Sequence, residues 1–287
     1  MERLIKFSFE DFDAKQIFEC GQCFRWNAIG ENSYIGVANG RVLKVSQKGE
    51  EIVFENTDQN EFDSLWNDYF DLKKDYKAAK SILSDGGVMD KAISFGGGIR
   101  ILKQDPWETL LSFIISSNNN IPRIKKIIET FCRLFGKSVS AFSDTYYAFP
   151  NPSELYGIEK GDLAPLCAGY RDEYLIDAIK KVNSGEINLD EIYGLDYISL
   201  KAELMKIKGV GPKVADCIAL FGFAKEEAFP VDVWVRRVLH TLYNKEYTAK
   251  EAAEFAQKSF GKYAGIAQQY LFYYMRENAS ILGLQEG

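Results

Sequence analysis

The chain has 287 residues, of which 46% are hydrophobic and 14% aromatic, so it can bury a substantial core and form about two domains. Its net charge of −6 counts against a surface that binds nucleic acid throughout, although a local basic patch could still bind DNA. The sequence contains no run of about 18 apolar residues, so no transmembrane helix is predicted.

The first 60 residues or so are predicted to form strands. The three candidate strands are Tyr34–Ala38, Arg41–Val45 and Glu51–Glu55. Asn39-Gly40, between the first two, is a strong hairpin signal. Apolar residues then recur at helical spacing from Phe62 to Leu83. This part of the chain is therefore expected to be an antiparallel sheet with helices on one face.

A glycine run, from Phe95 to Ile99, predicts the joint between two domains, residues 1–98 and 99–287. No Lys-Ser or Lys-Thr pair follows the glycines, which excludes a phosphate-binding loop of the P-loop type. From Arg100 onward the pattern is helical almost throughout. The predicted fold class is thus α+β, with an N-terminal antiparallel sheet domain and a mostly α-helical region after it.

Cys20 and Cys23 form a C-x-x-C pair, a spacing that can hold a metal or carry out redox chemistry. No second such pair and no nearby histidine accompany it, so unpaired structural thiols are the preferred interpretation and no metal site is predicted. Five cysteines without a disulfide framework suit a reducing compartment. Because the first residues also lack a signal-peptide core, we expect an intracellular protein.

The stretch from about 204 to 223 predicts a helix, a hairpin and a second helix. Leu204 and Ile207 are spaced as one apolar face entering a turn, and Pro212 suits the first position of the second helix. Free amides beside glycines at a helix N-terminus form an anion site, for which a DNA phosphate is the natural ligand. The residues expected to bind it are Lys208, Gly209, Val210 and Gly211.

Lys213 lies in the first turn of the second helix, where the helix dipole and desolvation both favour the neutral amine. It could therefore act as a nucleophile near neutral pH. Cys217, four residues later, shares its helical face. Asp232 is predicted to cap the next helix, from Val233 to Tyr243. An amine and a carboxylate are thus expected at two neighbouring helix starts.

The motif G-V-G-P-K-V-A-D-C followed by P-V-D resembles the helix-hairpin-helix DNA glycosylases with lyase activity, and among them the 8-oxoguanine DNA glycosylase family. The motifs G-Q-C-F-R-W, S-S-N-N-N-I-P-R-I and G-Y-R precede it in the family's order. The resemblance covers nearly the whole chain. It implies an enzyme that flips 8-oxoguanine out of duplex DNA, attacks C1′ with Lys213 assisted by Asp232, and nicks the abasic strand by β-elimination from a Schiff base.

The resemblance also implies which residues hold the base. The main-chain carbonyl of Gly21 meets N7–H of the damaged base, and Gln268 contacts its Watson–Crick edge. Phe272 covers one face of the ring and Cys217 forms the opposite wall. Gln268 and Phe272 are four residues apart on the last predicted helix, so both can face one pocket.

A further set of residues is implied to contact the rest of the duplex. Asn118 fills the gap that the extruded nucleotide leaves, and Asn119 belongs to the same DNA-contacting motif. Arg123 and Arg171 read the orphaned cytosine, and Tyr170 acts as a wedge in the duplex. Without the resemblance, the asparagines would be interpreted as a solvated loop and the Tyr-Arg pair as packing plus a surface charge.

No cofactor is expected. No cysteine follows Cys217, which excludes the C-terminal four-cysteine iron–sulfur loop of the endonuclease III relatives, while a structural cation at the hairpin stays open. Trp234 stands where the family often carries a histidine, so the phosphate contact that this histidine makes is left open for this chain. His240 is expected to be structural or on the surface.

Two other functions are compatible with these residues: a glycosylase for another damaged purine, and a non-catalytic helix-hairpin-helix module that binds DNA. The expected partner is double-stranded DNA containing 8-oxoguanine opposite cytosine, bound by a monomer without a membrane role. The expected location is the cytoplasm of a bacterium or archaeon, and otherwise the nucleus.

Overall fold

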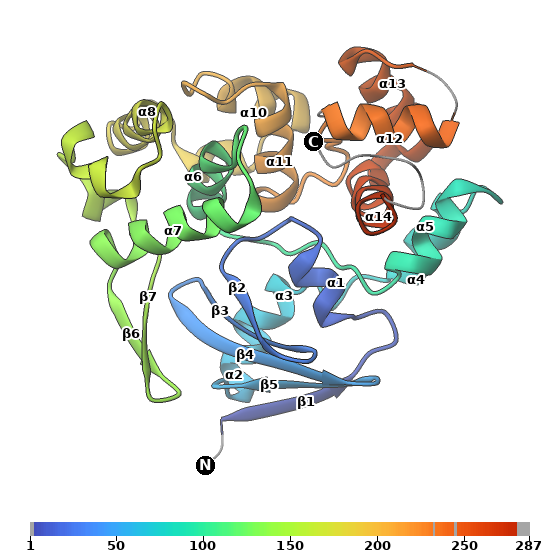
Figure 1. Cartoon of the computed structure of the whole chain (residues 1–287), viewed down its shortest axis with the longest axis horizontal. Helices are drawn as coiled ribbons and strands as arrows, with labels where there is room; N and C mark the ends of the chain where they lie inside the picture. Colours follow the sequence, from blue (N-terminus) through green and yellow to red (C-terminus); the bar gives the residue numbers. More distant parts are fainter. Residues whose placement is uncertain (1–2, 232, 244–245, 280–287) are drawn as a thin grey trace.

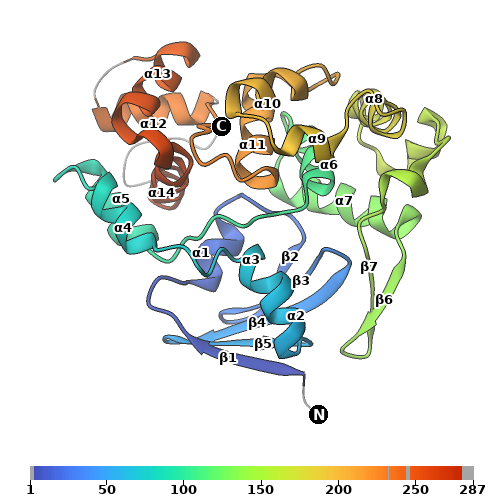
Figure 2. The same cartoon turned by 180° about the vertical axis from the view of Figure 1, so that it is seen from behind.

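The computed structural model describes residues 3–231, 233–243 and 246–279. It contains a five-stranded antiparallel sheet followed by a mostly helical region, which confirms the predicted α+β class. Figures 1 and 2 show the sheet below the helices, with the short helix α1 (Ala14–Glu19) on the side of the sheet that faces them. No described helix is long and apolar enough to cross a membrane.

The sheet has the strand order β1-β5-β4-β3-β2. Its strands are β1 (Leu4–Ser8), β2 (Trp26–Gly30), β3 (Ser33–Ala38), β4 (Arg41–Lys48) and β5 (Glu51–Glu55). The three predicted strands are present, and Asn39 and Gly40, with φ of 50° and 69°, form the predicted hairpin turn. Strands β1 and β2 were not predicted, because they lie at the edges and expose much of their surface. Of β2, only Trp26 is buried.

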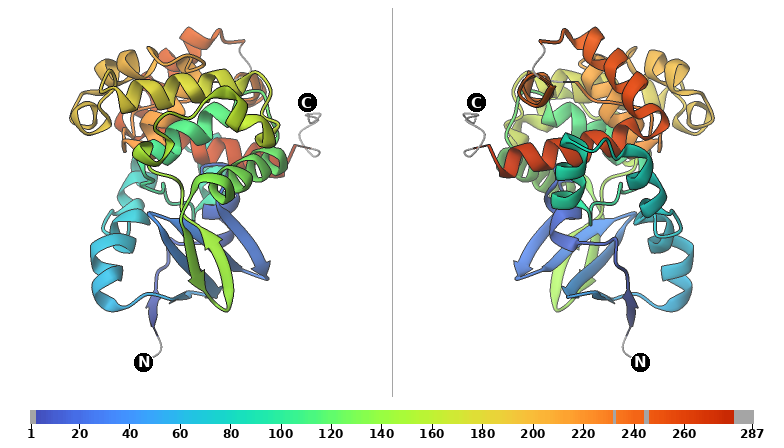
Figure 3. Two further views of the ribbon diagram at one scale, coloured as in Figure 1. Left: turned by 90° about the vertical axis from the view of Figure 1, so that its left-hand side faces the viewer. Right: turned by 90° about the vertical axis from the view of Figure 1, so that its right-hand side faces the viewer.

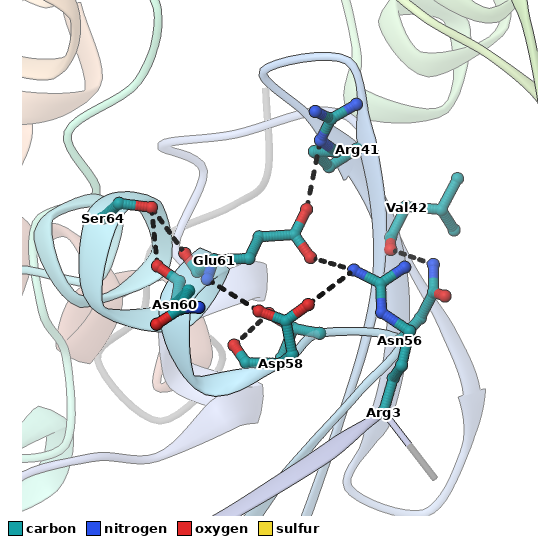
Figure 4. A network of polar contacts seen from close by, with 9 residues as sticks. Arg3, Arg41, Val42, Asn56, Asp58, Asn60, Glu61 and Ser64 are labelled. Carbon is teal, nitrogen blue, oxygen red and sulfur yellow. Dashed lines mark hydrogen bonds and ion pairs between the residues drawn. The ribbon is translucent and has the colours of Figure 1, made fainter. Parts of the chain in front are cut away.

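Ion pairs connect the starts of strands β1 and β4, at one end of the sheet, to the helix that follows the sheet. Arg3, just before β1, pairs with Asp58 and Glu61 at nitrogen–oxygen distances of 3.6 and 2.5 Å, and Arg41 of β4 reaches Glu61 at 3.1 Å (Figure 4). Asp58 caps α2 (Gln59–Glu61). Because these pairs are partly exposed, each contributes only about 0–1 kcal/mol to the stability of the fold.

The segment from Phe62 to Leu83, predicted at helical spacing, is helical in parts and does not form one continuous helix. The segment contains η1 (Phe62–Trp66), α3 (Asn67–Tyr69) and α4 (Tyr76–Leu83). Between the last two, the buried guanidinium of Arg100 donates to the main-chain oxygens of Phe70, Asp71 and Lys74. Asp71 also has a positive φ of 51°. Carbonyls turned toward Arg100 cannot continue a helical ladder, so the helix ends there.

The helical region surrounds α6, which is buried almost entirely. Its helices are α5 (Val88–Gly96), α6 (Pro106–Ser116), α7 (Ile121–Phe135), α8 (Arg171–Asn183), α9 (Leu189–Tyr193), α10 (Tyr197–Leu204), α11 (Pro212–Gly222), α12 (Val233–Tyr243), α13 (Ala249–Phe260) and α14 (Ala264–Glu277), with short 3-10 turns at Pro152–Leu155, Lys160–Leu166 and Gly261–Tyr263. Tyr76 of α4 and Met89 of α5 belong to the same core. The domain boundary at residue 98 stays a prediction, although these two helices pack with the helical region.

A β-hairpin interrupts the helical region, contrary to the expectation that it would be helical almost throughout. Strands β6 (Ser138–Ala141) and β7 (Asp144–Tyr147) extend from α7 and lie along the sheet (Figure 3). Val139, Ala141 and Tyr146 pack on a small cluster of sheet residues. The two strands are short and half-exposed, so their sequence carries little apolar pattern, and their partner surface lies about 100 residues earlier in the chain.

Arg25, in the loop before β2, connects the sheet to α6. Its guanidinium donates to the carbonyl of Tyr147 and lies 3.6 Å from the carboxylate of Glu108 on α6. Burial raises the pKa of Glu108 to about 7, although the charge of Arg25 opposes this rise. The folded protein therefore holds a proton on Glu108 at pH values where the unfolded chain has lost it.

This proton predicts a pH dependence of stability. Between about pH 4.5 and pH 7 the folded state binds more protons at Glu108 than the unfolded state does, so its contribution to the free energy of unfolding falls as the pH rises. In Glu108→Gln the side chain is neutral throughout, and this decline should disappear. Urea unfolding at pH 5, 6 and 7 measures it, with Glu129→Gln on the exposed face of α7 as the control. Parallel profiles for the wild type and Glu108→Gln would contradict the prediction.

Candidate active site

The predicted helix-hairpin-helix is formed by α10, a turn and α11. Ile207 and Val210 in the turn are 1% and 5% exposed, so they anchor it in the core. Gly209 has a φ of 85°, and Pro212 is the first residue of α11. Sequence and structure agree here because the glycine supplies a left-handed conformation and the proline tolerates a helix start.

Side chains of helix α8 contact this hairpin and fix its conformation. A Cβ atom added to Gly209 would lie 2.2 Å from the ring of Tyr174, so only glycine allows this close contact. The Asp177 carboxylate accepts a hydrogen bond of 2.7 Å from the Lys208 amide, and the Lys181 ammonium donates to the Lys206 carbonyl at 2.7 Å. The conformation of the hairpin is therefore set before any ligand binds.

Not all main-chain amides of the hairpin are free to donate to a ligand. The amide of Lys208 is bound by Asp177, and that of Val210 donates to the carbonyl of Ile207 at 3.0 Å. Within the described residues, the amides of Gly209 and Gly211 donate to no protein acceptor. These two are the amides best placed to bind a phosphate, and the predicted contacts through the other two stay predictions. An open groove of about 570 Å³ runs from here past Tyr170.

The Lys208 side chain pairs with Glu173 of α8 at 3.0 Å, and this carboxylate raises the pKa of the lysine. The groove at the hairpin therefore carries acidic as well as basic groups. Its attraction for a phosphate must come mainly from the main-chain amides and the start of α11.

The residues predicted to hold the base come together around one cavity. Lys213 and Cys217 lie on α11, Gly21 in the loop after α1, and Gln268 and Phe272 on α14. The other lining residues are Cys20, Phe113, Phe221, Pro230 and Gln269. A single cavity thus collects an amine, two thiols, amides and aromatic rings from four separate parts of the chain.

This cavity is closed to a purine. Its volume is about 70 Å³, whereas a cavity that takes up benzene measures about 150 Å³. The ring of Phe272 lies against the loop, because a Cβ atom on Gly21 would be 3.5 Å from Phe272 Cε1. The walls must therefore separate before a base can enter between Phe272 and Cys217.

Lys213 reaches the cavity from the first turn of α11 and is partly buried. Its Nζ atom lies 5.9 Å from the centroid of the Phe113 ring on α6. Asp232, its predicted partner, lies outside the described residues, as does the Trp234 side chain. Helix α12 begins at Val233, as predicted. The structure thus places Lys213 at the cavity, and the role of Asp232 stays a prediction.

The asparagine loop joins α6 to α7. Asn119 donates to the carbonyl of Ile115 at 3.0 Å, and Asn120 caps α7 by accepting from the Arg123 amide at 3.0 Å. Asn118 is exposed, has a φ of 48°, and its amide group bonds to no described residue. Asn118 is therefore accessible and its contact with DNA stays a prediction, whereas Asn119 stabilises the end of α6.

The two arginines predicted to read cytosine are placed differently. Arg123 is exposed, and its guanidinium donates one hydrogen bond of 3.0 Å to the carbonyl of Cys167. Arg171 is only 3% exposed and donates to the carbonyls of Ser117 and Asn118, and also of Ala168. In this conformation Arg171 holds the asparagine loop, and a contact with cytosine would require some of these bonds to break.

Tyr170 lies at the start of α8 beside this loop. Its ring is half-exposed and stacks 4.5 Å from the Arg171 guanidinium, and its hydroxyl donates to the Ser117 carbonyl at 3.3 Å. The predicted wedge thus projects next to Asn118 on the side of the groove at the hairpin.

Cys20 and Cys23 are buried and not joined by a disulfide. Burial raises the pKa of Cys20 to about 12 and that of Cys23 further still, so both thiols stay protonated. Among the described residues no cluster of three or more His, Cys, Asp or Glu side chains could hold a metal. His240 is exposed on α12.

Sequence reasoning missed several lining residues. Phe113 and Phe221 belong to apolar helices, where no pattern separates a pocket wall from core. Gln269 carries a weak signal, because it is a second buried amide directly after Gln268. Adjacent helical residues point about 100° apart, so the spacing alone did not suggest that both would reach one cavity.

Comparisons with known proteins show the family to which the chain is similar. Residues 4–110 match the family described as 8-oxoguanine DNA glycosylase, N-terminal domain, and residues 111–262 match the HhH-GPD superfamily of base excision DNA repair proteins. A probable N-glycosylase/DNA lyase of Methanothermobacter thermautotrophicus is 33% identical over 238 residues, 76% of each chain.

Two solved structures are similar over nearly the whole chain. MBOgg1 in complex with a low-affinity DNA ligand is 45% identical, with a TM-score of 0.93 and 96% of each chain covered. The Clostridium acetobutylicum 8-oxoguanine glycosylase/lyase, bound to double-stranded DNA with cytosine opposite 8-oxoguanine, is 43% identical. Its TM-score is 0.90, with 97% of this chain and 98% of that chain covered.

The hairpin allows a matched test of phosphate binding. Gly209→Ala should lower the free energy of unfolding by roughly 1–3 kcal/mol, because the alanine would have to adopt the positive φ of the glycine and its Cβ would clash with Tyr174. It should also weaken the affinity for abasic duplex DNA. Gly211→Ala meets open space at a φ of −88°, so both quantities should stay close to wild type. Equal effects of the two substitutions on stability and affinity would contradict this account.

Proposed function

The chain belongs to the 8-oxoguanine DNA glycosylase family, and from this premise we propose how its site excises the damaged base. The enzyme is a bifunctional glycosylase and abasic lyase that removes 8-oxoguanine from double-stranded DNA. The observation that carries the proposal is the cavity in which the Lys213 amine meets the predicted base-binding residues.

The base must leave the helix stack before it can react. Flipping the base out costs a few kcal/mol. Two sets of protein contacts offset this cost: those with the extruded base and those of side chains that fill the gap left in the duplex. The exposed Asn118 and the half-exposed Tyr170 lie side by side, positions suited to filling that gap. The closed cavity then opens as Phe272 and the Gly21 loop separate, and the purine stacks between Phe272 and Cys217.

The reaction uses the amine of Lys213 as its nucleophile. Nζ attacks C1′, the N-glycosidic bond breaks, and the bonding electrons leave with the base. The sugar ring then opens: the C1′–O4′ bond breaks, O4′ takes up a proton as the 4′ hydroxyl, and a protonated Schiff base joins Nζ to C1′. Removal of a proton from C2′ then expels the 3′ phosphate and nicks the strand. We propose that Asp232 stabilises the positive charge that develops on the sugar.

Recognition of the lesion is proposed to depend on Gly21. In 8-oxoguanine N7 carries a hydrogen, which the main-chain carbonyl of Gly21 can accept, whereas N7 of guanine is a bare acceptor. Guanine would bring two acceptors together and leave both unsatisfied, a difference of roughly 1–3 kcal/mol. Gln268 on the Watson–Crick edge would bind either purine.

We propose that the enzyme acts as a monomer and needs no cofactor, with a cation at the hairpin as the open alternative. Because its substrate is DNA, it works inside the cell, in the cytoplasm of a bacterium or archaeon and otherwise in the nucleus.

The proposed function predicts a specific pattern of excision. Under single-turnover conditions the wild type should cleave a duplex with 8-oxoguanine opposite cytosine and leave the undamaged duplex intact. Lys213→Gln should bind the lesion duplex but yield neither cleavage nor a borohydride-trapped adduct. Cleavage of an alkylated-adenine duplex in place of the 8-oxoguanine duplex would favour the other-purine alternative. Lys213→Gln with wild-type activity would refute the assigned nucleophile.

The different placement of the two arginines predicts different mutant phenotypes. Arg123→Ala removes an exposed guanidinium, so stability should change by less than about 0.5 kcal/mol while the preference for cytosine over adenine opposite the lesion narrows. Arg171→Ala should instead lower the free energy of unfolding, since it deprives buried carbonyls of donors. Thermal unfolding and excision rates for both opposite bases measure this, with Arg133→Ala as the exposed control. An unchanged cytosine preference in Arg123→Ala would oppose its assignment.

A further inference from the structure

Gln269 is a buried amide in the base cavity for which the proposed function has no role. It lies on α14, is 3% exposed, and lines the same cavity as Lys213 and Gln268. Its Nε2 atom donates to Oε1 of Gln268 at 2.7 Å. Its own Oε1 atom is buried and has no hydrogen-bond donor among the described residues.

An unsatisfied oxygen of this kind is costly. Leaving a buried acceptor without a donor destabilises a fold, and native structures contain few such groups. In a cavity that takes up a ligand, the missing donor is most simply one that the ligand supplies. Tyr270, the next residue, offers an internal comparison: its hydroxyl is also buried without a partner in the part of the chain that the structure describes, but it does not line the cavity.

The chemistry of the two amides matches the base. Because Oε1 of Gln268 is occupied by Gln269, the pair presents one NH₂ group, from Gln268, and one free oxygen, from Gln269. If oxygen and nitrogen were exchanged in both amides, the pair would still present one NH₂ group and one oxygen, with the NH₂ group then on Gln269 and the oxygen on Gln268. The Watson–Crick edge of 8-oxoguanine carries an acceptor, O6, beside two donors, N1–H and the 2-amino group. One NH₂ and one oxygen can satisfy such an edge.

We propose that Gln269 is a second base-binding residue of the enzyme. Its Oε1 accepts a hydrogen bond from the donors on the Watson–Crick edge of the extruded 8-oxoguanine. Its Nε2 holds the Gln268 amide so that the NH₂ group of Gln268 meets O6. This inference rests on the proposed function and deepens it, because it assigns the recognition of the edge to a pair of amides instead of Gln268 alone.

Gln269→Met tests the proposal, because methionine keeps the length of the side chain and removes its hydrogen bonding. Single-turnover excision of 8-oxoguanine should slow by about tenfold, the factor expected when one hydrogen bond in a buried site is lost. Cleavage of a preformed abasic site should stay at the wild-type rate, since no base then occupies the cavity. The melting temperature should stay close to that of the wild type, because the unsatisfied oxygen of Gln269 is removed while the buried oxygen of Gln268 loses its donor.

Tyr270→Phe is the matched control. It removes the neighbouring unsatisfied hydroxyl outside the cavity and should change neither activity. Gln269→Leu serves as a second variant if Gln269→Met does not fold.

The outcomes separate the inference from the proposed function. Excision at the wild-type rate in a folded Gln269 variant would overturn the inference alone. A parallel loss of excision, abasic-site cleavage and melting temperature would also overturn it, because it would show a structural role. A wild type that cleaves abasic DNA but leaves 8-oxoguanine in place would refute the proposed function, and the inference with it.

Discussion

Close packing of helix α11 is the constraint on which both the hairpin and the base cavity depend. Every residue from Val214 to Gly222 is buried. On one side a Cβ atom at Gly265 of α14 would lie 2.4 Å from Leu220, so the glycine lets the two helices approach closely. This approach brings the amides and the aromatic ring of α14 to the thiol of Cys217, while the first turn of α11 carries Lys213 beside the hairpin. Any shift of α11 would move Lys213, the cavity and the hairpin together.

The acidic net charge and the DNA substrate are reconciled by how the site distributes its charges. Around the hairpin, Lys208 pairs with Glu173 and Lys206 with Glu203, so the lysine charges are largely compensated there. What remains is a pair of main-chain amides at a helix start, and we propose that their fixed dipoles bind a phosphate. A rigid site of this kind needs no basic surface.

The sequence predicted the elements that carry strong local signals. The three inner strands, the Asn39-Gly40 turn and the helix-hairpin-helix were found because alternation, turn chemistry and Gly-Pro punctuation act over a few residues. The edge strands and the β6–β7 hairpin escaped notice, since half-exposed strands have little apolar pattern. The break at Asp71 is set by Arg100, about 30 residues later, and no local pattern contains that information.

The site was predictable in a different way. Spacing alone placed Lys213 and Cys217 on one helical face, but only resemblance to a family connected them to Gly21, Gln268 and Phe272. The structure adds that Arg171 is buried and that Gln269 shares the cavity, which are consequences of tertiary packing.

The central claim is that the amine of Lys213 bonds covalently to the sugar of the damaged nucleotide. Borohydride reduction of the wild type on an 8-oxoguanine duplex, followed by nuclease and trypsin digestion and mass spectrometry, locates that bond directly. The account predicts the added mass on Lys213, in a peptide that trypsin has failed to cut after this residue. Added mass on Lys206, Lys208 or any other amine would contradict it.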